Sequence, residues 1–259
     1  MTKIQPKWKL TLKVLPFVFA AVAAKSITHY YGWEYFSLSP LFTALISANI
    51  FLVGFLITGV LSDYKESEKL PAELASSIET VADEFIIIAK TKKAKEARDG
   101  LAYCIAFAQA FLNWTRKKVK TGALMDKISG FNDCFIAVES LTQPNFIARL
   151  KSEQHLIRKV VNRIHTIRET NFSEAAYAIA EIITMLLVAG FLFVKIEPYY
   201  ESIFFLAFVS FILIYLLFLI RDLDNPFSYY EKESLTEEVS LYPVENVKNR
   251  LTAATREFD

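Results

Sequence analysis

The chain has 259 residues, of which 53% are hydrophobic and 14% aromatic, and only 7 are glycine. Its 29 lysine and arginine residues nearly balance 28 aspartate and glutamate residues, so the charge gives no reason to propose a nucleic-acid partner. The hydrophobic residues are gathered in long blocks and not spread at the spacing of a soluble core, which indicates a membrane protein.

Four hydrophobic blocks reach the roughly 20 residues that a helix needs to cross a bilayer. These blocks are residues 12–31, 41–62, 176–196 and 203–220. The first block follows several lysines and has the alternative interpretation of an uncleaved signal sequence. It continues as far as Lys25 and beyond, and a second block follows at once, so we expect a true membrane span.

Basic residues in the connections predict the orientation of the spans. The first 13 residues contain four lysines, whereas the link 32–40 contains Glu34 and no lysine or arginine. The link 197–201 is acidic and aromatic, as is typical of an outer loop, and a hydrophilic segment rich in lysine and arginine separates the second and third spans. We therefore expect both termini and the central segment to be cytoplasmic.

The central segment has helical periodicity throughout, and no alternating strand pattern competes with it. Pro71 is expected to begin a helix, Asp99 and Gly100 to separate two helices, and Pro144 to begin another. The predicted helices cover 72–95, 101–118, 125–140 and 145–168. Their apolar positions at helical spacing, which should face the core, are Leu74, Ile78, Val81, Phe85, Ile88, Tyr103, Ala106, Phe107, Ala110, Phe111, Trp114, Phe146, Leu150, Leu156, Val160, Val161 and Ile164.

These elements predict an all-α, polytopic membrane protein with four transmembrane helices, a helical cytoplasmic domain and cytoplasmic termini. The expected division is 1–62 for the amino-terminal segment and first two spans, 63–172 for the cytoplasmic domain, 173–221 for the last two spans and 222–259 for a cytoplasmic tail. The chain lacks an organelle-type presequence rich in arginine and serine, which favours a bacterial plasma membrane.

Catalytic chemistry has little support in the sequence. Cys104 and Cys134 both fall on the predicted cytoplasmic side, so a structural disulfide is not expected. The three histidines lack metal-type partners at the usual spacing, and there is no phosphate-binding glycine-rich loop and no serine nucleophile flanked by glycines. We expect no enzyme and no cofactor. An enzyme whose groups meet only in three dimensions is the alternative that the sequence leaves open.

Three polar side chains fall inside the predicted spans, where they are costly unless paired or hydrated. Asn49 is expected to bond across helices, the alternative being that it faces a conduit. For Lys25 we expect snorkelling to the interface, and for Glu181 a place near the cytoplasmic boundary. Pairing between helices or subunits is the alternative for both.

The second span carries two phenylalanines, Phe51 and Phe55, on one helical face. Ser47, Thr58 and Ser62 extend this face, while Gly54, Gly59 and Ala48 on the opposite side would let neighbouring helices approach closely. A single four-helix bundle has no room for water along its middle, so a pore along this face requires an oligomer. Ordinary packing of the phenylalanines is the alternative, and the sequence favours neither.

Two motifs resemble those of the bestrophins. The run Phe51-Leu-Val-Gly-Phe-Leu-Ile-Thr58, with its polar continuation, is similar to the pore helix of that family, in which such phenylalanines form a hydrophobic neck. The run Asp224-Asn225-Pro226-Phe227 resembles the family's Asn-Pro-Phe-Gly or Asp-Pro-Phe-Gly signature. The order of spans, insert, spans and Pro-Phe motif also agrees, so the resemblance covers most of the chain in architecture.

The chain departs from the family pattern at two places. Ser47 stands where the neck usually has a third bulky apolar residue, which implies a polar ring above two aromatic rings. The glycine after Phe227 and the aspartate-rich calcium clasp of animal members are missing, so calcium control is not expected. Solvation is the ordinary role of the acidic positions that remain there, Glu231, Glu233, Glu237 and Glu238.

The resemblance implies an oligomeric ion channel, a homopentamer, whose partners are its own copies, membrane lipid and small inorganic ions. The positions that it assigns to the pore are Ser47, Phe51, Phe55, Thr58 and Ser62, and the family-motif positions are Gly54, Asn225, Pro226 and Phe227. Aromatic edges are partly positive, which favours small anions such as chloride. The alternatives are a non-conducting membrane scaffold or regulator that binds a cytoplasmic partner, and the loosely related prokaryotic bestrophin-like domain family, for which channel activity is not implied.

Overall fold

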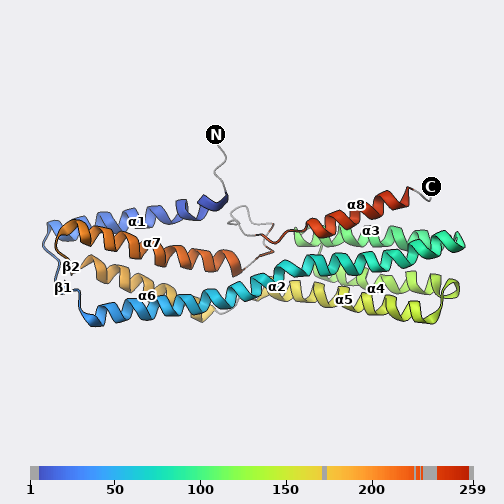
Figure 1. Cartoon of the computed structure of the whole chain (residues 1–259), viewed down its shortest axis with the longest axis horizontal. Coiled ribbons are helices and arrows are strands. Elements are labelled where there is room, and N and C mark those ends of the chain that lie inside the picture. The colour runs from blue at the N-terminus through green and yellow to red at the C-terminus, as the bar shows by residue number, and fades with distance from the viewer. Residues whose placement is uncertain (1–5, 171–173, 225, 228, 230–237, 257–259) are drawn as a thin grey trace. The chain divides into compact units, whose positions relative to one another are not determined.

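The computed structural model describes residues 6–170, 174–224, 226–227, 229 and 238–256, and it is built almost entirely of helices (Figure 1). The helices are α1 (Pro6–Tyr30), α2 (Pro40–Lys92), α3 (Lys95–Thr115), α4 (Thr121–Val138), α5 (Pro144–Glu169), α6 (Glu174–Leu192), α7 (Tyr199–Asp224) and α8 (Tyr242–Thr255), with a 3₁₀ turn at Glu139–Leu141. Two short parallel strands, β1 (Phe36–Ser37) and β2 (Val194–Lys195), pair with each other.

The chain divides into two compact units. Unit 1 contains α1, α2 as far as Tyr64, α6 and α7, and unit 2 contains the rest of α2 with α3, α4, α5 and α8. The units are defined by packing alone, so the predicted four-part division of the chain stays a prediction.

Among the described residues, four helices are long and apolar enough to cross a membrane. This supports a multi-pass membrane protein, as expected from the composition. The predicted second and fourth spans fall inside α2 and α7, the first matches α1 closely, and the third begins inside α6. The predicted third span ran to Ile196, but α6 ends at Leu192 because Val194 and Lys195 leave the helix to pair with β1.

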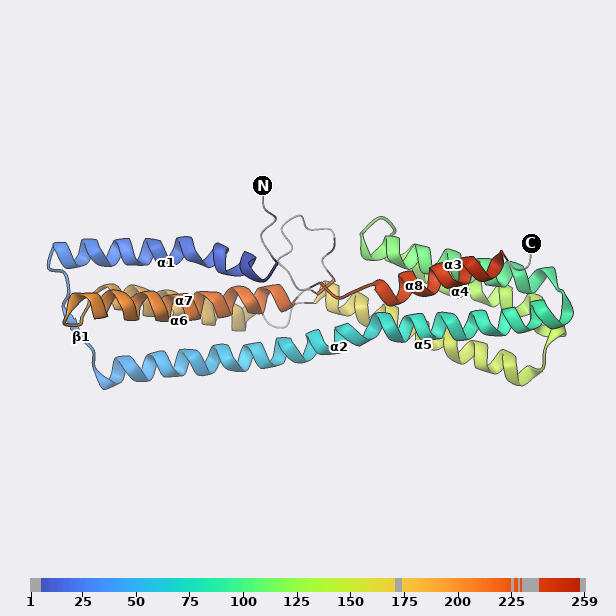
Figure 2. The ribbon, with the colours of Figure 1, turned by 45° about the horizontal axis from the view of Figure 1, so that its top comes forward.

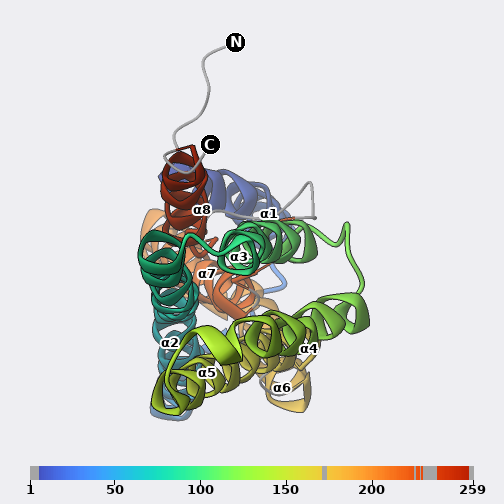
Figure 3. The same ribbon diagram turned by 90° about the vertical axis from the view of Figure 1, so that its right-hand side faces the viewer.

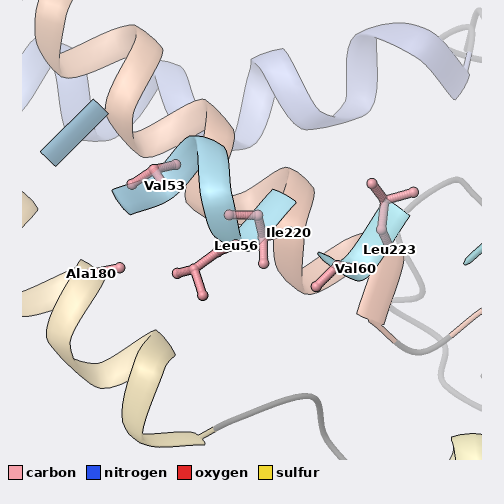
Figure 4. Packing of buried hydrophobic residues seen from close by; sticks show 6 residues of the cluster. All are labelled: Val53, Leu56, Val60, Ala180, Ile220 and Leu223. Carbon is pink, nitrogen blue, oxygen red and sulfur yellow. The ribbon is translucent and has the colours of Figure 1, made fainter. Parts of the chain in front are cut away.

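In unit 1, α1 packs mainly on α7, and α6 packs on α7 and α1 (Figures 1 and 2). The inner face of α2 closes one apolar cluster, in which Val53, Leu56 and Val60 meet residues of α6 and α7 (Figure 4). The members from those two helices are Ala180, Ile220 and Leu223. A second cluster of Ala21, Phe191 and Leu206 joins α1, α6 and α7.

Unit 2 is a helical bundle, and Figure 3 looks along several of its helices. The predicted inward positions of the second part of α2 are all buried, from Leu74 to Ile88. Trp114 of α3 is also buried, its Nε1 donates to Thr121 Oγ1 at 3.1 Å, and the Arg168 guanidinium lies 4.8 Å from its ring centre. Two predicted core residues, Ala106 and Leu156, are exposed instead, because each lies at the edge of its helix's apolar face.

Pro71 does not begin a helix, contrary to the prediction, and lies inside the continuous helix α2. An interior proline lacks the N–H that would bond to the preceding turn and costs about 3 kcal/mol. The neighbouring Leu70, Leu74 and Ile78 are all buried, and each contributes about 1.5–3 kcal/mol. Packing on both sides of the proline therefore outweighs its cost.

The prediction that Asp99 and Gly100 separate two helices is also wrong, since both lie within α3. The break falls earlier, at Lys93, whose φ is 54°. Gly100 serves packing, because a Cβ at this position would lie 2.5 Å from the Phe85 ring. Helix α8 in the tail, which packs on α3, was not predicted.

Candidate functional site: an exposed face of α2

All five predicted pore residues lie on the exposed face of α2 in unit 1. Phe51 is 78% exposed and Phe55 66% exposed, although both are large apolar side chains. Ser47, Thr58 and Ser62 are exposed as well. The opposite face is buried at Val53, Leu56 and Val60. The packing of unit 1 thus leaves one continuous stripe uncovered, with two aromatic rings between hydroxyl-bearing residues.

The hydroxyls of this stripe bond back to their own helix. Ser47 Oγ donates to the Thr43 carbonyl at 3.0 Å, and Thr58 Oγ1 donates to the Gly54 carbonyl at 2.9 Å. A hydroxyl in this rotamer presents acceptor lone pairs outward, and one that rotates presents a donor. The stripe can therefore offer an ion either polarity above and below the phenylalanines.

Gly54 has no packing role inside the protomer, because a Cβ built there would meet nothing within 4 Å. Its predicted role, close approach by a neighbouring helix, stays a prediction that involves another copy of the chain. Asn49 behaves as expected, since it is buried and its Nδ2 donates to Thr184 Oγ1 of α6 at 3.0 Å.

Pro226 and Phe227 of the Pro-Phe motif lie in unit 2 and make packing and backbone contacts there. Phe227 is fully buried, and the carbonyl of Pro226 accepts a hydrogen bond from the backbone N–H of Val239 at 3.0 Å. The hydrogen bond places Val239, just before α8, against the motif. Asn225 lies outside the described residues, as do Glu231, Glu233 and Glu237 of the predicted acidic face.

Lys25 does not snorkel, contrary to the expectation. Its side chain is fully buried, its Nζ lies 2.6 Å from a Glu34 carboxylate oxygen, and it also donates to the carbonyl of Val194 at 2.6 Å. The other Glu34 oxygen lies 2.9 Å from His29 Nδ1, and the His29 ring stacks on Tyr199 with centres 4.0 Å apart. These residues tie α1, the following link, β2 and α7 together.

Glu34 lies in the link between α1 and α2, and its neighbours favour the ionised form of its carboxyl group. Burial raises the pKa of its carboxyl, but the hydrogen bonds from Lys25 and His29 outweigh burial and bring that pKa below its ordinary value of 4.5. Glu181 forms an ion pair with Arg221 of α7, so the predicted alternative of pairing between helices holds for it, while its place near the cytoplasmic boundary stays a prediction.

Both cysteines are free thiols in unit 2. Cys104 is fully buried, and burial raises the pKa of its thiol far above the ordinary value. Burial also raises the pKa of Cys134, and the neighbouring Asp133 carboxylate adds to the effect. Among the described residues, no group of three or more histidine, cysteine, aspartate or glutamate side chains is placed to hold a metal ion.

Comparison with known proteins identifies the fold. No protein-family model and no curated protein sequence matches the chain. Solved structures do match: one bacterial bestrophin homologue from Klebsiella pneumoniae has a TM-score of 0.74 at 16% identity, over 97% of this chain and 99% of that one. A mutant of the Klebsiella pneumoniae homologue has a TM-score of 0.79 at 14% identity, over 94% of this chain and 99% of that one. The resemblance to bestrophins is thus confirmed at the level of the fold.

Proposed function

We propose that this chain is the subunit of a pentameric, bestrophin-like ion channel in a bacterial plasma membrane, with its termini and unit 2 on the cytoplasmic side. One observation carries the proposal: the stripe Ser47, Phe51, Phe55, Thr58 and Ser62 is left uncovered on a fold shared with bacterial bestrophin homologues. Its two largely exposed phenylalanine rings lie one turn apart and are flanked by hydroxyls, as a narrow conduit between copies would require.

The conduit must lie between copies of the chain. The inner face of α2 is filled by Val53, Leu56 and Val60 against α6 and α7, which leaves no water path there. Arranged around an axis, several copies of the exposed stripe would enclose a channel. Gly54 leaves open space where a neighbouring helix would fit, and Pro226 and the buried Phe227 hold the chain at Val239.

Rings formed by Phe51 and Phe55 would make an apolar neck that closes when water leaves it. The edges of the rings carry partial positive charge and favour a weakly hydrated anion such as chloride. The Ser47 hydroxyls provide a polar ring at one side of the neck. Selectivity for small anions follows from the aromatic edges and from rotation of the hydroxyls to donate.

Bilayer recordings test the neck. We expect Phe51→Ala and Phe55→Ala to raise open probability or conductance, because each removes an apolar ring from the constriction. Phe208 of α7 is the matched control, since it is 55% exposed but lies outside the stripe, and Phe208→Ala should conduct like the natural chain. Unchanged currents in both α2 variants would remove these residues from the neck. Reversal potentials in chloride and potassium gradients test the sign of selectivity.

The oligomeric state separates the channel from a non-conducting scaffold. The channel requires a particle of about 148 kDa of protein, five times the chain mass of 29.6 kDa, in native mass spectrometry. A monomer or dimer would contradict the proposal. A pentamer that passes no ions in liposomes would favour the scaffold.

A further inference from the structure

A groove of about 510 Å³ lies in unit 1 between α1, α6 and α7. Its walls are almost entirely apolar, and α2 contributes none of the lining residues that the structure describes. The lining includes Phe17 of α1, Glu181, Ala189 and Leu192 of α6, and Leu217 and Arg221 of α7. The groove is therefore separate from the stripe proposed to line the pore.

The polar end of the groove carries one charge of each sign. Arg221, in the last turn of α7, forms an ion pair with Glu181 of α6. Arg221 is 60% exposed and Glu181 37% exposed, so both can meet a ligand. A guanidinium has five N–H donors and a carboxylate has two oxygens, so each group keeps bonding capacity beyond this pair.

The groove has the length of a lipid tail. From Glu181 to Leu192 it follows about 16 Å of helix at about 1.5 Å per residue. The hydrocarbon core of a bilayer is about 30 Å thick and holds two layers of acyl chains, so one chain reaches about 15 Å. A tail that starts at the charged end would fill the groove along its length.

We propose that this groove binds one acyl chain of a phospholipid whose headgroup carries a phosphate and a primary ammonium. The phosphate accepts hydrogen bonds from Arg221, for which the planar guanidinium is well suited. The ammonium donates to Glu181. A phosphocholine headgroup lacks N–H donors for the carboxylate, and a phosphoglycerol headgroup offers Glu181 only neutral hydroxyl donors and no second cation beside Arg221. Phosphoethanolamine lipid satisfies both protein charges.

Native mass spectrometry of the purified full-length protein, titrated with lipids of identical tails and different headgroups, tests this site. We expect phosphoethanolamine lipid to bind about tenfold more tightly than phosphocholine or phosphoglycerol lipid, the change expected from about one charge-assisted hydrogen bond. Arg221→Gln should weaken all three lipids, and Glu181→Gln should abolish the preference for phosphoethanolamine. Equal binding of the three headgroups would overturn the proposal.

A second pair of variants tests whether the acyl chain of the lipid lies in the groove. Ala189→Trp puts an indole into the groove and should abolish the bound lipid, whereas Ile182→Trp puts the same indole on the exposed outer face of α6 and should leave binding unchanged. Circular dichroism and native mass confirm that both variants are folded. Unchanged lipid binding in Ala189→Trp would overturn the proposal. A second result would also overturn it: Ala189→Trp loses the oligomer, and the natural chain shows no headgroup preference. The groove would then be a contact between copies of the chain.

Discussion

The ammonium group of the buried Lys25 is stabilised inside unit 1 by three hydrogen-bond acceptors. Lys25 Nζ meets the Glu34 carboxylate and the carbonyls of Leu192 and Val194. Burying two charges costs several kcal/mol per ion, and good geometry with further hydrogen bonds offsets that cost. Removing one member leaves the other charge buried without its partner.

We therefore expect Lys25→Met to destabilise the protein by about 3–5 kcal/mol. The double variant Lys25→Met with Glu34→Gln should recover part of this loss, since the carbonyls still lack a donor. Denaturant unfolding in detergent micelles measures the effect. Lys195→Met is the control, because its pair with Glu197 is exposed and its loss should change little. An unchanged unfolding midpoint in Lys25→Met would contradict the geometry.

The ion pair of Lys25 and Glu34 should also make the stability of the protein depend on pH. The folded pKa of Glu34 lies below its ordinary value of 4.5, so the unfolded chain binds the proton more readily. The stabilisation is present above pH 4.5 and is lost as the pH falls through the lower, folded pKa. Unfolding midpoints measured from about pH 6 to about pH 3 should fall less steeply in Glu34→Gln than in the natural chain. Parallel curves would show that Glu34 is not held charged.

The sequence predicts the shared face of Phe51 and Phe55 but not the contact between Lys25 and Glu34, and the difference has a physical reason. Phe51 and Phe55 share a face because helical spacing alone decides it, and the structure places both on the exposed side. Lys25 and Glu34 are nine positions apart, and their contact depends on the turn after α1. Periodicity contains no information about that turn, so snorkelling remained the simpler expectation.

At the scale of elements, substitution by alanine is expected to change the stability in opposite directions at two glycines. Gly100 in α3 faces the Phe85 ring, whereas a Cβ at Gly122 in α4 meets nothing within 4 Å. Gly100→Ala should destabilise the protein by about 1–3 kcal/mol, because a fully buried ring must move. Gly122→Ala should stabilise it by up to about 1 kcal/mol through helix propensity. Chemical unfolding of both variants checks the contrast, and equal effects would contradict the packing.

Gly100 and Pro71 also show why helix ends were mispredicted. Local chemistry assigns glycine and proline to boundaries, but each lies inside a helix whose neighbouring residues are deeply buried. Apolar periodicity was the stronger signal at both places, because Leu74 and Ile78 on one helix, and Phe107 and Phe111 on the other, are all buried. The tail helix α8 was missed because its few apolar residues gain their burial only against α3.

At the scale of the whole molecule, assembly can be separated from folding at Gly54. A Cβ built at this glycine meets nothing within 4 Å, so we expect the single protomer to accommodate a larger side chain. If neighbouring copies approach there, Gly54→Leu should give a folded protein of smaller native mass. Gly122→Leu is the control in a similarly open position. Natural oligomer mass in Gly54→Leu would place the contact between copies elsewhere.

The two native thiols have a practical consequence for testing the proposed pore stripe. At neutral pH the raised pKa values leave Cys104 and Cys134 almost entirely protonated, and a protonated thiol reacts slowly with alkylating probes. Single cysteines introduced at Ser47, Thr58 or Ser62 would then be modified against a low background, without altering the native residues. Cys104 is fully buried and Cys134 is half-buried, so the natural chain, probed in parallel, measures the background of the two native thiols.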